Sequence, residues 1–135
     1  MIVDTSALLA YFDAGEPQHD AVAAIIEGSR DPLIVSPFVI AELDYLVLTR
    51  HGSDAEQAVL SELSGGAWEL ALMDQERIRA ATRLVETYSD IPIGITDASN
   101  MVLAQAYQTR DIATLDRSYF QILRFSDGSA PRILP

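Results

Sequence analysis

A chain of 135 residues and 14.8 kDa, with 49% hydrophobic and 21% charged residues, has the size and composition of one folded globular domain, which excludes disordered, collagen-like and low-complexity classes. The absence of cysteine excludes a disulfide framework, a thiolate nucleophile and any zinc or iron–sulfur site built on cysteine. The net charge of −11, from 20 acidic residues against nine arginines, opposes contact with nucleic acids and anionic membranes unless cations bridge the two surfaces.

The first half of the chain predicts two strands and four helices. Residues 1–3 form a short apolar run that ends at Asp4, and the residues that follow have the pattern of a helix. Further along, apolar residues at helical spacing alternate with Gly and Pro breaks. We expect a strand at 1–3, a helix at 7–12, a helix from 16–17 to just before 28, a strand at 33–35, a helix at 38–50 and a helix capped by 53–54 and ending near 63.

The second half of the chain predicts further strands and two long helices. Asp74 is placed to cap one helix, and Thr96 and Asp97 open the next. We expect a strand within 67–73, helices at 74–88 and 96–107, a strand at 112–115, a helical turn beginning at Asp116, and one or two edge strands within 123–134 around a turn at 126–129.

Strands that alternate with helices predict an α/β fold in which right-handed crossovers build a parallel sheet covered on both faces. Ligands of such sheets bind at the carboxyl ends of the strands. The apolar runs are far shorter than the ~20 residues of a membrane span, and the first residues lack the basic segment of a signal peptide. We therefore expect a cytoplasmic protein that does not engage a membrane.

Three aspartates stand where a strand or loop leads into a helix at the same predicted edge: Asp4, Asp97 and Asp116. Each alone has a plain explanation as a helix cap. Glu42 differs, because it lies in the most apolar helix, beside Val39 and Leu43, where a carboxylate is costly unless it is paired or binds a cation.

Four carboxylates at one edge would repel one another unless a divalent cation supplied positive charge. A cluster with only oxygen ligands suits Mg²⁺ or Mn²⁺. Four hydroxyl side chains lie next to the acids in sequence and serve either to orient them or as helix caps: Thr5, Ser6, Thr96 and Thr114.

Short motifs spread over nearly the whole chain resemble the PIN-domain ribonucleases, in particular the VapC-type toxins of bacterial type II toxin–antitoxin pairs. Each motif alone is weak, but their order along the chain is specific. They are residues 2–9, Ser36-Pro37 with Ala41-Glu42-Leu43, Thr96-Asp97-Ala98, and residues 113–117 with Phe120. Many relatives carry a further Asp just before that phenylalanine, where this chain has Tyr119, so no fifth acidic ligand is expected there.

The resemblance implies a single PIN domain over residues 1–135, a three-layer αβα sandwich with a short central parallel sheet. It also implies metal-dependent endonucleolytic cleavage of RNA with Mg²⁺ or Mn²⁺, a homodimer, and an antitoxin with a basic C-terminal segment as partner. The family's acidic metal-binding and catalytic positions fall on Asp4, Glu42, Asp97 and Asp116.

One alternative stays open from the sequence: a catalytically silent PIN-like binding module, which would have no affinity for cations. Among the basic residues, Arg117 beside Asp116 is the best candidate for a phosphate contact, whereas Arg77, Arg79 and Arg83 read as a solvated helix face. His19 reads as a helix-surface residue, and His51 as a helix C-terminal residue.

Overall fold

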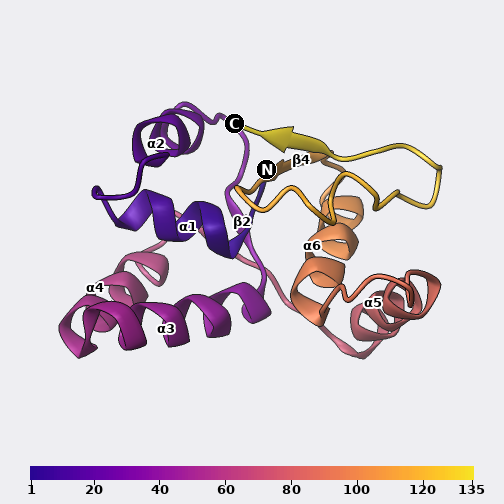
Figure 1. Cartoon of the computed structure of the whole chain (residues 1–135), viewed down its shortest axis with the longest axis horizontal. Coiled ribbons are helices and arrows are strands. Elements are labelled where there is room, and N and C mark those ends of the chain that lie inside the picture. The colour runs from indigo at the N-terminus through magenta and orange to yellow at the C-terminus, as the bar shows by residue number, and fades with distance from the viewer.

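The computed structural model describes residues 1–135 and contains a five-stranded, fully parallel sheet in the order β3-β2-β1-β4-β5 (Figure 1). The first strand of the chain therefore lies at the centre of the sheet. In chain order the elements are β1 (Ile2–Val3), α1 (Thr5–Phe12), α2 (His19–Glu27), β2 (Ile34–Val35), α3 (Pro37–His51), α4 (Ser53–Leu63), β3 (Glu69–Leu70), α5 (Gln75–Thr87), α6 (Ile95–Ala106), β4 (Asp111–Ala113) and β5 (Arg132–Leu134).

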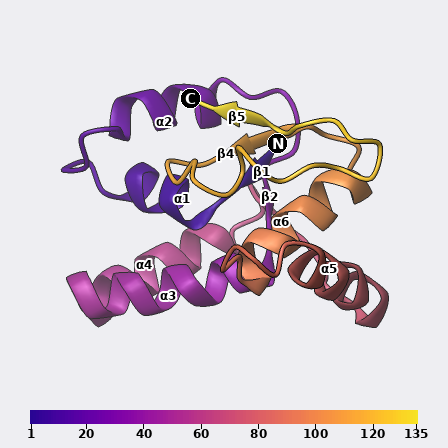
Figure 2. The same ribbon diagram turned by 45° about the vertical axis from the view of Figure 1, so that its right-hand side comes forward.

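The helices form two layers, one on each face of the sheet, and this arrangement confirms the predicted α/β sandwich (Figure 2). Neighbouring residues of a strand point to opposite faces. Val3, Val35 and Ala113 belong to a core shared with α1 to α4. Their strand neighbours Ile2, Ile34 and Ile112 belong to a second core, which α6 shares with Phe120 and the loop after β4.

Helix α3 is bounded by residues that suit its two ends. The Ser36 hydroxyl accepts a 3.2 Å hydrogen bond from the Phe38 N–H, and Pro37 occupies the first turn, where no N–H is needed. Gly52 separates α3 from α4 with φ of +87°, a conformation that favours glycine. The predicted cap of α4 at 53–54 is wrong, because Gly52 is the capping residue and Ser53 already belongs to the helix.

Three other predicted elements differ from the structure. The second helix begins at His19, because the preceding residues form a turn in which Asp13 accepts from the Gly15 N–H at 2.9 Å. The strand expected within 67–73 shortens to Glu69–Leu70 at the sheet edge, where only β2 pairs with it. The C-terminal region contributes one strand, β5, parallel to β4 at the opposite edge.

The helical turn expected at Asp116 begins one residue later and stays short, since the Gln121 N–H donates to the Arg117 carbonyl at 3.2 Å and the Leu123 N–H to the Tyr119 carbonyl at 3.0 Å without a longer helix. Residues 115–122 form bends and turns, in which Asp116 Oδ1 accepts from the Ser118 N–H at 3.2 Å. That local bond turns the chain without starting a helix. No helix of the protein is both long enough and apolar enough to cross a membrane.

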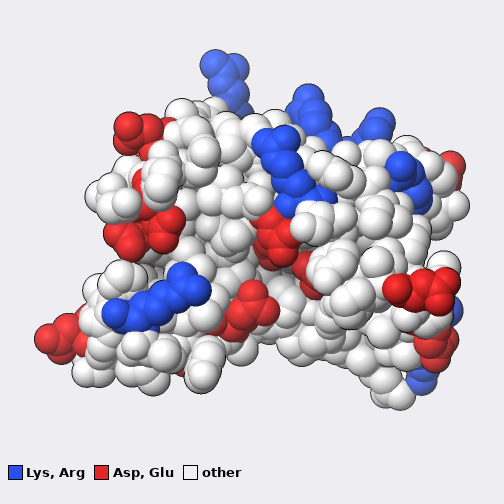
Figure 3. Space-filling view, in the orientation of Figure 1, with Lys and Arg blue, Asp and Glu red and all other residues white.

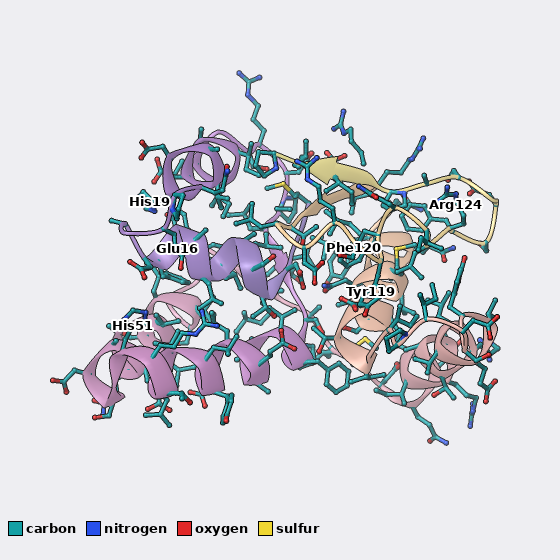
Figure 4. All side chains as sticks on the ribbon, in the orientation of Figure 1. Glu16, His19, His51, Tyr119, Phe120 and Arg124 are labelled. Carbon is teal, nitrogen blue, oxygen red and sulfur yellow. The ribbon has the colours of Figure 1, made fainter.

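The two histidines both connect helices (Figure 4). His19 is only partly exposed, and its Nδ1 lies 2.7 Å from the Ala10 carbonyl oxygen, so it joins α2 to α1 and is not a free surface residue. His51, in the last turn of α3 as expected, also approaches Asp13 at the end of α1, with 3.4 Å between Nε2 and Oδ2. Neither histidine contacts the predicted acidic site.

Candidate active site

Asp4 is the buried centre of the site and follows β1 directly. Its side chain is 5% exposed, and its backbone N–H donates to the Ala113 carbonyl at 2.9 Å, which continues the β1–β4 pairing. Although Asp4 precedes α1, its carboxylate makes no capping hydrogen bond to that helix. The explanation of Asp4 as a helix cap therefore fails, and its carboxylate interacts with other parts of the chain.

Neutral donors hold both carboxylate oxygens of Asp4. The Thr114 hydroxyl, just after β4, donates to Oδ2 at 2.8 Å, and the Asn100 amide of α6 donates to Oδ1 at 2.9 Å. Ser6 lies 3.1 Å from the Thr114 hydroxyl and also reaches Oδ2, at 3.5 Å. Thr114 accepts from the Asp116 N–H at 3.1 Å, so one hydroxyl connects the positions of two acids.

Asp97 lies in the first turn of α6, half-buried, and the three other acids surround it. Burial, followed by the negative charges of Asp4, Asp116 and Glu42, raises the pKa of Asp97 to about 6, and the Gly94 backbone N–H offsets only part of that rise. Burial also raises the pKa of Asp4, which the Thr114 hydrogen bond partly opposes. The four predicted acids thus come together within electrostatic range.

Glu42 is exposed on α3, although Val39 and Leu43 near it on the helix are buried. The prediction that an apolar environment would make its carboxylate costly is therefore wrong. Its position relative to the other acids is nevertheless as expected. Oε2 accepts from the Thr96 hydroxyl at 3.4 Å, so the residue beside Asp97 also contacts Glu42.

Of the four hydroxyls singled out from the sequence, three contact the acids. Thr114 and Ser6 bind Asp4, and Thr96 binds Glu42, whereas the buried Thr5 hydroxyl has no hydrogen-bond partner. Asn100 was missed, although a polar residue three positions after Asp97 falls on the same side of a helix whose other neighbours are apolar. That spacing is the signal that could have identified it.

The four predicted acids form the acidic group of the candidate site, and Figure 3 shows acidic side chains gathered near the centre of one face of the molecule. The ion pairs of the protein, His51 with Asp13 and Arg132 with Asp111, do not include any of its members. Arg117, the predicted phosphate contact, instead donates to the Pro135 carbonyl oxygen. None of the four carboxylates therefore forms an ion pair with Arg or His.

The donor set fits a hard divalent cation such as Mg²⁺ or Mn²⁺, because every candidate ligand is an oxygen and the site lacks positive charge. No three acidic or histidine side chains are close enough together to form a ready-made metal site. The oxygen donors available to a cation are the carboxylates of Asp4, Glu42, Asp97 and Asp116.

The chain is similar to known proteins over its full length. The PIN domain family matches residues 1–125. Ribonuclease VapC26 of Mycobacterium tuberculosis (strain ATCC 25618 / H37Rv) is 58% identical over 135 residues, which is the full length of both chains.

Three solved structures share the fold. VapC20 of M. tuberculosis, a toxin that cleaves the sarcin–ricin loop, has a TM-score of 0.81 at 16% identity and matches over 90% of this chain and 93% of its own. A toxin–antitoxin complex from Klebsiella pneumoniae has a TM-score of 0.70 at 17% identity over 98% of both chains. VapBC2 of Rickettsia felis, bound to a promoter DNA fragment, has a TM-score of 0.67 at 16% identity over 90% and 91%. Sequence and fold together establish that the chain belongs to the PIN domain family, as a VapC-type member.

Proposed function

We propose that this protein is an endoribonuclease toxin that uses Mg²⁺ or Mn²⁺ and is neutralised by a cognate antitoxin. The observation that carries the proposal is the convergence of four carboxylates, from four separate parts of the chain, with no cationic partner. The full-length likeness to a ribonuclease supports RNA as the substrate. A net charge of −11 makes a bridging cation necessary at the point where RNA phosphate approaches.

The roles of the residues follow from their contacts. A bound divalent cation would neutralise the scissile phosphate and lower the pKa of the attacking water. Asp4, Glu42 and Asp97 would hold that cation, and Asp116 would complete the site. Thr114 fixes one oxygen of Asp4 through its 2.8 Å hydrogen bond and, through the Asp116 N–H, sets the position of the fourth acid. These contacts arrange the ligands before substrate arrives.

Purified protein tests the proposal directly. In chelator we expect almost no cleavage of single-stranded or loop RNA, and Mg²⁺ or Mn²⁺ should restore it, with Ca²⁺ a poor substitute. Cleavage that survives exhaustive metal removal would contradict metal dependence. A folded protein without any cation affinity would instead be the silent binding module.

Two partners belong to the proposal. The antitoxin would place an Arg of a basic C-terminal segment among the carboxylates, where a guanidinium can pair with two oxygens at once. A second copy of the chain would cover α3, where Tyr45 is 67% and Leu48 is 42% exposed. Sedimentation of wild type and of the double variant Tyr45→Arg, Leu48→Glu checks the dimer, which the variant should disrupt.

A further inference from the structure

Asn100 is the one fully buried amide side chain that touches the candidate active site. Its exposure is 0%, it lies on α6 among apolar neighbours, and its Nδ2 donates to Asp4 Oδ1 at 2.9 Å. Its own Oδ1 is buried and has no hydrogen-bond partner. A buried polar atom without a partner costs folding free energy, so the fold gains no stability from that half of the amide.

One turn of α6 connects the acids to one another. Thr96 donates to Glu42, Ser99 lies 2.7 Å from the Ser36 hydroxyl at the start of α3, and Asn100 donates to Asp4. Asp97 belongs to the same turn. Because Asn100 follows Asp97 by three residues, both side chains project from one side of the helix. Asn100 is the member of this turn that reaches the most buried acid.

An amide suits this position for a chemical reason. Thr114 already binds Oδ2 of Asp4, so the Asn100 amide gives the second oxygen a donor and fixes the plane of the carboxylate. An aspartate at position 100 would add a fifth negative charge, and an apolar residue would leave Oδ1 of Asp4 without a partner. Asparagine supplies a donor and adds no charge.

We propose that Asn100 is a positioning residue that orients the Asp4 carboxylate for cation binding. The inference rests on the proposed function, since it concerns the same site. Groups that orient metal ligands typically change metal affinity by ~10- to 100-fold when they are removed.

Asn100→Leu separates positioning from a purely structural role. Leucine keeps the branching at Cγ but removes both the donor and the unpaired oxygen. We expect the melting temperature of the metal-free variant to fall, because Asp4 Oδ1 loses its donor, so the Mn²⁺ affinity is the readout that separates the two roles. The Mn²⁺ dissociation constant, measured by calorimetry, should rise ~10-fold or more, and cleavage should recover largely at saturating Mn²⁺. Met101→Leu, a fully buried neighbour on the same helix, serves as the matched control and should bind Mn²⁺ as wild type does.

The outcomes distinguish the two proposals. Equal Mn²⁺ affinity in Asn100→Leu and wild type overturns the positioning role and leaves the nuclease proposal intact. Wild type that does not bind Mn²⁺ at all overturns the nuclease proposal first. If the variant does not fold, the side-chain ¹⁵N signal of Asn100 in wild type decides: it should shift on Mg²⁺ addition with the same midpoint as the Asp4 backbone amide, and an unchanged signal overturns the inference.

Discussion

The hydroxyl oxygens of Ser36 and Ser99 lie 2.7 Å apart, fully buried, and join the first residue before α3 to the first turns of α6. Helix α3 carries Glu42 and helix α6 carries Asp97, so this contact fixes how the two acids face each other. Ser99 donates its hydroxyl proton to the Thr96 carbonyl at 2.7 Å, so Ser36 is the donor in the serine pair, and the Ser36 hydroxyl oxygen also accepts from the Phe38 N–H at 3.2 Å.

Replacement of Ser36 should weaken the fold measurably. Ser36→Ala removes the N-cap of α3, worth about 1 kcal/mol, and a buried hydrogen bond of similar value, so we expect a loss of about 2 kcal/mol in the free energy of unfolding. Urea denaturation measures it. Thr49→Ala on the same helix is the control, because that exposed hydroxyl binds only the Tyr45 carbonyl and its loss should be nearly neutral. Equal effects of the two changes would refute the role of Ser36.

Asp97→Asn tests whether repulsion or capping dominates at the start of α6. Without metal at pH 7.5, the variant should melt at the same temperature as wild type or higher, because it removes a half-buried charge from beside three other carboxylates. Asparagine keeps an oxygen that can accept from the Gly94 N–H. RNA cleavage should fall by more than ~100-fold. A lower melting temperature in metal-free buffer would instead support a capping role.

Added Mn²⁺ should stabilise wild type more than Asp97→Asn. A hundredfold excess of Mn²⁺ over its dissociation constant should stabilise wild type by about 2.7 kcal/mol, and the variant should respond less. Thermal melts with and without Mn²⁺ provide this comparison. An equal response of both proteins would show that Asp97 does not hold the cation.

The raised pKa of Asp97 predicts a pH dependence with a definite sign. Below about pH 6 the folded, metal-free protein keeps a proton on Asp97 that the unfolded chain releases near its ordinary value of 3.8. Stability of the metal-free protein should therefore decline as pH rises from about 4 to 6 and then level off. The wild-type decline, measured by melts against pH, should be reduced in Asp97→Asn.

Cation affinity should instead increase as pH rises, because protons compete with the cation for the same carboxylate oxygens. Below pH 6 the Mn²⁺ affinity should fall by about tenfold per pH unit for each proton displaced. Calorimetry between pH 5 and 8 measures this. Affinity that is constant across the interval would exclude Asp97 as a ligand.

The inserted Arg proposed for the antitoxin predicts competition with metal. On co-expression with the cognate antitoxin, Arg→Ala in its C-terminal segment should restore toxicity, and excess Mn²⁺ should relieve inhibition by the unmodified antitoxin in vitro. Apolar contacts must accompany the charge, since exposed ion pairs alone are weak at physiological salt. Inhibition that survives both changes would refute competition while leaving the pairing itself intact.

The sequence predicted the sheet class and the meeting of the four acids because both follow from local rules. Apolar pairs such as Ile2–Val3 and Ile34–Val35 mark buried parallel strands, and acids placed after such strands meet at one edge. Strand order, with β1 in the centre, depends on long-range packing that no local pattern encodes.

The errors have physical causes of the same kind. Glu42 was expected to be buried because its helix is apolar nearly all round, yet α3 also exposes Tyr45 and Leu48, so apolar neighbours did not define its environment. Asp116 was expected to begin a helical turn, but its side chain accepts from the Ser118 N–H, and the turn begins at Arg117 instead. Asn100 was missed because its partner Asp4 is 96 residues away in sequence.

The central position of β1 bears on when the protein becomes active during its synthesis. Asp4 is among the first residues to be translated, but its hydrogen-bond donors are Asn100 and Thr114, and β4 must pair beside β1 before they meet. A nascent chain that stops short of Thr114 and Asp116 holds only isolated acids. Translation therefore cannot yield a partly working nuclease, because the acids meet only after both halves of the chain have been synthesised and joined in one sheet.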